Sequence, residues 1–248
     1  MEYLYGRNPV LESLRASRRK FKNLYLSQGV DLKSDVITEI KSLCSSKKIP
    51  ITPITQHKLE AIVKHRQHQG VVLEGSTYPY VTLDEIFTFS RNQNEDSLVL
   101  ILDLLQDPQN VGSLLRTAEA TGVHGVIIQE RRAVGITPSV VNSSSGAAEH
   151  LLISQVANIS QAIQVLKEKN VWVYGLGGVN EGVKYNEQDL SGPVGVVVGS
   201  EGEGLRDLVK KNCDGLISIP MKGKVDSLNA TIAGSIILYS IFETRNFK

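Results

Sequence analysis

Cysteine, tryptophan and long apolar runs are scarce in this sequence of 248 residues. The two cysteines, Cys44 and Cys213, lie far apart without a CxxC pair, and the five histidines lack metal-ligand spacing, so neither a disulfide framework nor a metal site is predicted. No apolar stretch approaches the roughly 20 residues that a membrane helix needs. The first residues have neither the pattern of a secretory signal nor that of a transit peptide. We therefore expect a cytoplasmic protein with no membrane span.

The charge is unevenly distributed along the chain, although the net charge is only +1. Residues 1–70 contain thirteen Lys and Arg against six Asp and Glu, whereas the remaining residues contain fourteen basic against twenty acidic side chains. A basic first part, at +7, followed by an acidic second part, at −6, favours a polyanion-binding domain joined to a catalytic one. A solvated charged surface would give the same asymmetry, so charge alone leaves both interpretations open.

Hydropathy patterns divide the chain into a small α/β domain over 1–75, a linker over 76–96 that has room for one helix, and a larger α/β domain over 97–248. In the small domain we expect helices over 9–16, 35–45 and 56–63 and strands over 23–26, 51–53 and 71–74.

The larger domain alternates between strands and helices, which is typical of a mostly parallel sheet covered by helices on both faces. The predicted strands are 98–103, 125–129, 151–155, 171–176, 194–199 and 216–219. The predicted helices are 111–121, 138–148, 159–169, 204–211 and 227–242.

The last helix has little polar surface over its final turns. A helix that is apolar nearly all round has to be covered nearly all round, and a terminal helix rarely achieves this within one small chain. We therefore predict a homodimer that uses this helix, with burial inside one protomer as the alternative.

Three polar segments follow predicted strands, where an α/β sheet binds its ligands. The first, DPQNVGSLLRTAEATG at 107–122, contains Asn110 at a possible helix N-cap. Its Arg116 lies off the apolar stripe of the helix, so it could either be solvated or grip a phosphate.

The second segment, GSEGEGL at 199–205, resembles neither GxGxxG nor a phosphate-binding loop with Lys and Ser. An ordinary nucleotide-dependent oxidoreductase is therefore disfavoured. Gly199 and its neighbouring glycines allow a backbone to approach a ligand, and Glu201 projects from among them.

The third segment, IPMKGKVDSLNATIAG at 219–234, leads into the last helix. Ser227 or Asp226 is placed to cap that helix, with Asn229 in its first turn. The same polar groups beside unpaired helix amides could instead line a pocket, so both roles stay open.

Together the three segments resemble the motifs of the SpoU family of S-adenosylmethionine-dependent RNA ribose 2′-O-methyltransferases, which have the trefoil-knotted SPOUT fold. The resemblance covers residues 97 to the C-terminus. Residues 5–10 and 68–72 are also similar to the RNA-binding domain of the subgroup that modifies a guanosine of large-subunit ribosomal RNA. Together these resemblances imply an α/β methyltransferase domain with a deep knot over 194–234 and a small N-terminal RNA-binding domain.

The resemblance also implies the site residues. Cofactor contacts fall on Gly199, Ile219, Met221 and Leu228, and the catalytic positions on Asn110, Arg116, Glu201, Ser227 and Asn229. The implied function is 2′-O-methylation of a ribose, with ribosomal RNA as the expected partner. The alternatives are a tRNA ribose methyltransferase and a non-catalytic RNA-binding assembly factor on the same fold.

Overall fold

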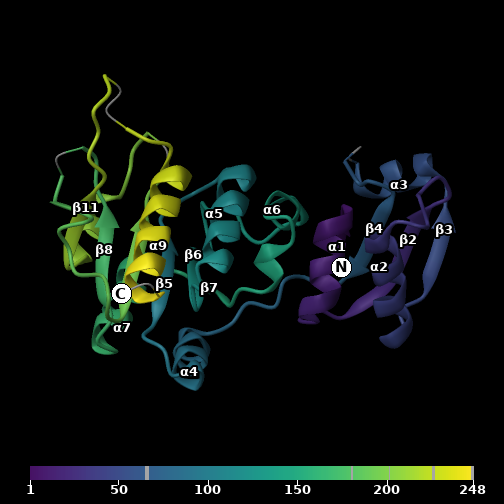
Figure 1. The fold of residues 1–248 in the computed structure, drawn as a ribbon, viewed down its shortest axis with the longest axis horizontal. Helices are drawn as coiled ribbons and strands as arrows, with labels where there is room; N and C mark the ends of the chain where they lie inside the picture. The colour runs from purple at the N-terminus through teal and green to yellow at the C-terminus, as the bar shows by residue number, and fades with distance from the viewer. Residues whose placement is uncertain (65–66, 180, 201, 225–226, 247–248) are drawn as a thin grey trace. The chain divides into compact units, whose positions relative to one another are not determined.

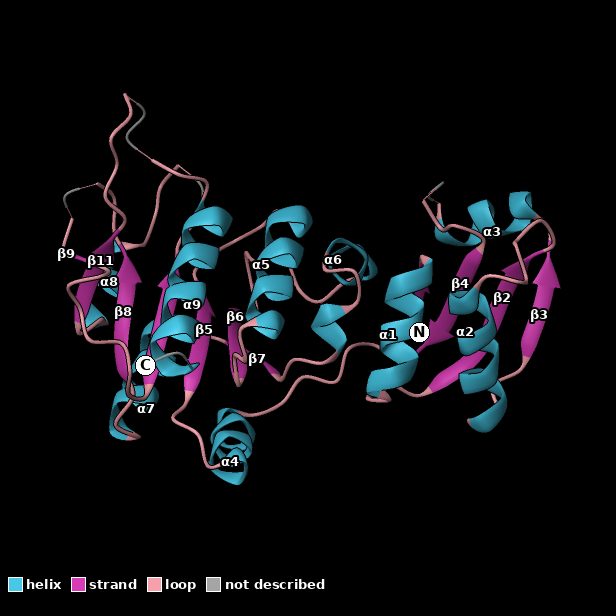
Figure 2. Cartoon of the chain, in the orientation of Figure 1, coloured by secondary structure: helices cyan, strands magenta, loops and turns pink. Residues whose placement is uncertain are grey.

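The computed structural model describes residues 1–64, 67–179, 181–200, 202–224 and 227–246. The chain forms two compact units, which Figure 1 shows as a ribbon and Figure 2 by secondary structure. One unit contains Met1–Pro79 and Ile136–His150, and the other contains Tyr80–Gly135 and Leu151–Lys248. The segment 136–150 therefore groups with the first unit, although the sequence analysis places it within the larger domain.

The first unit is built on a four-stranded sheet with the order β1-β4-β2-β3. Strand β4 pairs antiparallel with both β1 and β2, and β3 pairs parallel with β2. The strands are β1 (Glu2–Tyr5), β2 (Phe21–Ser27), β3 (Ile51–Ile54) and β4 (Val71–Gly75), and the helices are α1 (Arg7–Ala16), α2 (Asp35–Ser46), α3 (Gln56–Val63), α6 (Pro138–Ser143) and the 3-10 turn η1 (Ala147–Glu149).

Each strand and helix predicted for residues 1–75 is confirmed, with ends shifted by at most two residues. Strand β1 was not predicted, because its four residues precede a glycine and are too few to show alternation.

A buried ion pair holds η1 within the first unit. The guanidinium of Arg19 donates to the carboxylate of Glu149 at 2.7–3.0 Å, and both side chains are completely buried. A further N–H of Arg19 donates to Glu2 at 2.6 Å, and another bond reaches the carbonyl oxygen of Ser76 at 2.9 Å. Burial opposes the charge of Arg19, but the two carboxylates more than offset this and raise its pKa. The pair connects a segment near residue 149 to the N-terminal sheet.

The second unit is built on a seven-stranded sheet with the order β7-β6-β5-β10-β8-β11-β9, in which every neighbouring pair is parallel. The predicted parallel sheet is confirmed. Its strands are β5 (Leu98–Leu102), β6 (Gly125–Gln129), β7 (Ile153–Val156), β8 (Trp172–Leu176), β9 (Val183–Lys184), β10 (Val194–Val198) and β11 (Gly215–Ser218). Strands β5 and β10 lie side by side and are buried at every position, as expected for the centre of a covered sheet.

The helices of the second unit are α4 (Leu83–Gln93), α5 (Pro108–Ala120), α7 (Ile159–Glu168), α8 (Asp207–Asn212) and α9 (Ala230–Asn246). Helix α4 lies in the predicted linker and begins with a capping box formed by Thr82 and Glu85. Its residues Ile86 and Phe87 pack into the core of this unit, so the segment is more than a connection.

Four predicted helices differ in their limits. The helix predicted over 138–148 ends at Ser143, because Ser145 and Gly146 have positive φ angles of 55° and 93°. The helix predicted from Gly204 begins at Asp207, because Gly204 pairs with Ser200 across a tight loop.

The other two helices, α5 and α9, differ at their starts, and with them both proposed helix caps. Helix α5 is capped by Asp107, whose side chain accepts from Gln109 N, so Asn110 lies in the first turn and is not the N-cap. Helix α9 begins at Ala230, three residues later than predicted, so Ser227 precedes it and Asn229 is its cap.

Helix α9 packs against α5 and β10, and Figure 1 shows it alongside α5. The approach is close at Gly234, where an added Cβ would lie 3.0 Å from Leu114 Cδ1 and 3.1 Å from Val198 Cγ2. The opposite face leaves Ile232 and Tyr239 about half exposed, at 52% and 49%. Among the described residues, none of the helices combines the length and the apolar character of a membrane span.

We expect the substitution Arg19→Met to lower the free energy of unfolding by about 3–5 kcal/mol, because it leaves buried Glu149 without its counter-charge. Urea unfolding followed by circular dichroism would measure the loss. Arg15→Met is the matched control, since Arg15 also pairs with glutamates but is exposed and should change stability little. Equal losses in the two variants would contradict a special role for the buried pair.

Candidate functional site

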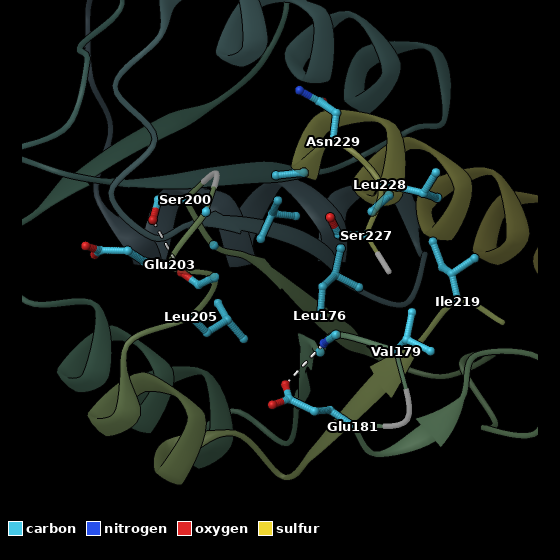
Figure 3. A pocket seen from close by; sticks show the side chains of 18 of the residues that line it. Leu176, Val179, Glu181, Ser200, Glu203, Leu205, Ile219, Ser227, Leu228 and Asn229 are labelled. Carbon is cyan, nitrogen blue, oxygen red and sulfur yellow. Dashed lines mark hydrogen bonds between the residues drawn. The ribbon is translucent and has the colours of Figure 1, made fainter. Parts of the chain in front are cut away.

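A cavity of about 580 Å³ lies at the carboxyl ends of three neighbouring parallel strands, β10, β8 and β11. The start of α9 closes another side of it. Figure 3 shows Ser200 and Glu203 on one side, Ile219 on the other, and Ser227 between them. The carboxyl edge of a parallel sheet, where neighbouring connections diverge, is where α/β proteins usually bind ligands. The first polar segment predicted from the sequence, residues 107–122, forms helix α5 and its two caps.

The structure brings six of the nine predicted site residues to this cavity. All four predicted cofactor positions line it, and so do two of the predicted catalytic residues: Gly199, Ile219, Met221, Leu228, Ser227 and Asn229. They come from the ends of β10 and β11 and from the entry to α9, which lie far apart in the sequence. This convergence of separate segments is what a single binding site requires.

A tight loop after β10 forms one wall of the cavity. Ser200 and Gly204 exchange backbone hydrogen bonds of 3.0 and 3.1 Å. Gly199 lies so close to the returning chain that an added Cβ would be 2.3 Å from Gly204 C and 2.5 Å from Leu205 N. Gly202 and Gly204 have positive φ angles of 87° and 66°, which favour glycine. The glycines are therefore required to shape the loop as well as to expose its backbone to the cavity.

A second wall, formed by the loop after β8, was missed by the sequence analysis. Gly178 N donates to the Glu181 carboxylate at 3.1 Å, and Lys210 Nζ lies 3.2 Å from the same oxygen. The backbone N–H of Gly178, followed by the ammonium of Lys210, lowers the pKa of Glu181. The signal that could have found this wall is the glycine pair Gly177-Gly178 directly after a strand.

The entry to α9 joins the cavity to α5 through two asparagines. Asn229 Oδ1 accepts from Thr231 N at 2.9 Å and from Ile232 N at 3.3 Å, and its Nδ2 donates to Asn110 Oδ1 at 3.5 Å. Thr231 Oγ1 also donates to the backbone oxygen of Asn110 at 3.2 Å. Asn229 therefore has both roles that its sequence position left open, since it caps the helix and lines the cavity. Asn110 is brought next to the site through this contact.

Two of the predicted catalytic residues that the structure describes, Asn110 and Arg116, do not line the cavity. Arg116 is exposed on α5, six residues after Asn110, and is not among the described residues that line the cavity. Glu201 lies outside the described residues.

The tight loop is fastened to the centre of the sheet by an ion pair that was also missed. Asp103, buried at the end of β5, accepts from the Arg206 side chain at 2.5 and 2.8 Å and from the Arg206 backbone N–H at 3.1 Å. Arg206 also donates to Gln129 Oε1 at 2.7 Å. The sequence signal was an acidic residue at the end of an otherwise apolar strand, because buried carboxylates are almost always paired.

The described lining suits a small organic ligand with both apolar and charged parts. Leu176, Ile219 and Leu228 supply apolar surface, and the loops supply backbone donors and acceptors. Two carboxylates, Glu181 and Glu203, and the ammonium of Lys210 give it mixed charge. Within the part of the chain that the structure describes, no group of three His, Cys, Asp or Glu side chains could hold a metal ion.

Two family models match this chain. The SpoU rRNA Methylase family matches residues 97–239, and the family described as RNA 2′-O ribose methyltransferase substrate binding matches residues 3–81.

Relatives match over nearly the whole length. A Bacillus subtilis protein, YacO, provisionally named a TrmH family tRNA/rRNA methyltransferase, is 38% identical over 99% of this chain and 96% of its own length. A Staphylococcus saprophyticus protein with the same provisional family name is 39% identical over 98% of this chain and 96% of its own.

Two solved structures share the fold. The SpoU methyltransferase AviRb from Streptomyces viridochromogenes, in complex with S-adenosylmethionine, superposes with a TM-score of 0.80 at 23% identity, over 97% of this chain and 89% of that one. The S-adenosylmethionine-bound rRNA methyltransferase from Sinorhizobium meliloti has a TM-score of 0.79 at 23% identity, over 97% and 86%. From its sequence motifs, its family matches and its parallel-sheet architecture, the chain belongs to the SpoU rRNA methylase family.

Proposed function

We propose that this chain transfers a methyl group from S-adenosylmethionine to a ribose 2′-hydroxyl of RNA, and that its substrate is a guanosine of large-subunit ribosomal RNA. The observation that carries the proposal is the cavity at the ends of β10, β8 and β11, where the four predicted cofactor residues meet Ser227 and Asn229. The match of residues 3–81 to a substrate-binding family and the basic charge of residues 1–70 support an RNA substrate.

The cavity fits the cofactor in size and chemistry. Its volume of about 580 Å³ lies within the range of about 300–1,000 Å³ typical of small-ligand sites. Leu176, Ile219 and Leu228 offer apolar surface for an adenine ring. Because Gly199 and Gly177 have no side chains, a ligand can approach the backbone closely there, and the carboxylates on the lining favour a cationic ligand. When bound, the cofactor supplies an electrophilic methyl group on a positively charged sulfur.

The residues of the chain act by positioning. Holding two reactants in line can contribute about 7–11 kcal/mol to lowering a barrier, so no covalent role for the protein is required. Asn229 is held rigidly by its bonds to the α9 amides and to Asn110, which suits it to orient the ribose. Ser227 presents a hydroxyl on the same lining. Glu201 completes the proposed set, with the role of orienting Arg116.

Arg116 is proposed to hold the target phosphate as a cation rather than to act as the general base. Deprotonating an ordinary guanidinium at pH 7 costs about 7 kcal/mol, at 1.36 kcal/mol per pKa unit. A planar guanidinium is well suited to bind a phosphate with two N–H groups. The ribose proton would then leave late in the reaction, through water.

The choice of RNA is the finer part of the proposal. The relatives above are provisionally named tRNA/rRNA methyltransferases, so tRNA is the specific alternative. Base choice in RNA depends on how a binding domain presents folded or unpaired segments. In this chain we propose that the first unit has this task.

The deep knot over 194–234 also stays a prediction.

Recombinant protein should transfer labelled methyl groups to ribosomal RNA from cells lacking this protein, yielding 2′-O-methylguanosine on digestion. Gly199→Ala should weaken cofactor binding in calorimetry by at least about tenfold, because the new Cβ meets the backbone of Gly204. Gly192→Ala is the control, since nothing lies within 4 Å of a Cβ there. Cofactor binding without transfer to any RNA would support the assembly-factor alternative, and transfer to tRNA alone would support the tRNA enzyme.

Arg116→Lys tests the cationic role. We expect the single-turnover rate to fall by about 10- to 100-fold with an unchanged rate–pH profile, because lysine keeps the charge but loses the two-pronged geometry. A shifted profile would instead support a base role. Arg91→Lys, on α4, is the control and should leave the rate unchanged. Nearly full activity of Arg116→Lys would contradict both roles.

A homodimer through α9 is also proposed. The half-exposed Ile232 and Tyr239 on this helix are large apolar side chains that a partner could cover. In a dimer formed there, the partner would lie near the site, because α9 begins at the cavity. We propose that the site then draws on both protomers.

Sedimentation analysis should give the mass of a dimer for the natural chain and of a monomer for the double variant Ile232→Lys/Tyr239→Lys. The two lysine charges would have to be buried in the interface without opposite charges, which is costly. The control is Leu208→Lys on α8, an exposed leucine elsewhere in the same unit, which should remain a dimer. A monomeric natural chain at micromolar concentration would refute the dimer.

A further inference from the structure

A second cavity, of about 490 Å³, lies in the first unit. It is separate from the cavity described above, which is lined by residues of the second unit. It is lined by residues from the start of α1, the end of β2, the start of α3 and the turn before β4: Arg7, Ser27, Gly29, Val30, Gln56, His68, Gln69 and Gly70. Its volume is again in the range of small-ligand sites. Arg7 is the only charged residue on the described lining, so the cavity favours an anionic ligand.

His68 is a buried polar group with an unused hydrogen bond. The residue is 2% exposed, and its Nδ1 accepts from Gly70 N at 3.0 Å. An imidazole that accepts at Nδ1 has its proton on Nε2, so Nε2 is a donor. This Nε2 has less than 1 Å² of exposed surface and no partner among the described residues. Buried donors are nearly always satisfied, and those that are not often point to a missing ligand or water.

Arg7 is held in place beside this histidine by Gln69. The Arg7 backbone N–H donates to Gln69 Oε1 at 3.0 Å, and Arg7 Nε donates to the Gln69 carbonyl oxygen at 3.4 Å. Gln69 has a positive φ of 51°, a strained backbone conformation for a residue other than glycine. Strain of this kind persists where the surroundings enforce it, and it is concentrated at ligand sites.

We propose that the cavity lined by Arg7, His68 and Gln69 binds one unpaired nucleotide of the substrate RNA, with the phosphate at Arg7 and an acceptor atom of the base or sugar at His68 Nε2. This inference rests on the proposed function, because it specifies how the first unit holds the RNA. All the lining residues fall within the substrate-binding match over residues 3–81.

An unpaired nucleotide fits better than duplex RNA. A cavity of this size admits a single nucleotide, and the free donor on its wall, His68 Nε2, is recessed. Base-paired RNA instead presents its phosphates and sugars on a broad outer surface. A recessed donor and a half-buried cation on the same lining match a base or sugar inserted behind its own phosphate. Because Nε2 is itself buried, the side chains around it have to move slightly when the nucleotide binds. The NMR signal of Nε2 would change as a result.

The test uses the full-length protein and a mixed-sequence single-stranded RNA of about 12 nucleotides, with a duplex of the same sequence for comparison. The ¹⁵N signal of His68 Nε2 is followed by NMR as RNA is added, and binding is measured by fluorescence anisotropy. We expect a saturable shift with the single strand. Arg7→Gln should weaken its binding about 10- to 100-fold, as expected for loss of a charge-assisted bond. Lys41→Gln, an equal charge loss on an exposed part of α2, is the control.

His68→Phe should also weaken single-strand binding more than the control does, and circular dichroism checks that it folds. If it does not fold, Arg7→Gln and the signal of the natural chain decide. An unmoved His68 signal, equal binding by Arg7→Gln and Lys41→Gln, or the same dependence on Arg7 with duplex RNA would each overturn the inference.

Methyl transfer is assayed in parallel. If the natural chain methylates RNA while the pocket variants match the control, only this inference fails. If the pocket binds RNA but no RNA is methylated, only the proposed function fails.

Discussion

The backbone contact between Gly199 and Gly204 determines the shape of the larger cavity. Because no side chain separates the two glycines, the chain leaving β10 turns back on itself and presents its peptide groups toward the ends of β8 and β11. The loop is then fastened at its far end by Arg206, which is bound to Asp103 at the end of β5. The site is thus formed by backbone geometry tied directly to the most buried strands. A side chain at position 199 would act on the whole wall rather than on one contact.

The structure also accounts for the polar residues before α9. A helix as apolar as α9 has to begin with partners for its free amides, and Asn229 provides them while its other amide atom reaches Asn110. The same side chain therefore caps the start of the helix and joins it to α5. In this way a requirement of folding places a hydrogen-bonding group at the edge of the cavity.

Much of the fold and of the site could be predicted from the sequence, because both depend on local signals. Alternating apolar segments predict the parallel sheet, and the glycines after β10 and the proline after β11 predict two of the segments that line the cavity, though not the loop after β8. The limits of α6, α8 and α9 could not be predicted, since they depend on positive φ angles at Ser145 and Gly204 and on a cap supplied by Asn229. The pairs Arg206–Asp103 and Arg19–Glu149 join residues more than one hundred positions apart, which no local pattern reveals.

The Arg19–Glu149 pair has a consequence for how this architecture could be inherited. The carboxylate that neutralises a buried arginine of the N-terminal sheet is encoded inside the region matched by the methylase family, not beside it. A gene fragment ending after Pro79 would encode a first unit without α6 and η1, in which Arg19 keeps Glu2 but loses its fully buried partner Glu149. Exchange of the RNA-binding part between relatives would therefore require two separate stretches of sequence to be exchanged at once. This favours evolution of the whole chain without such an exchange.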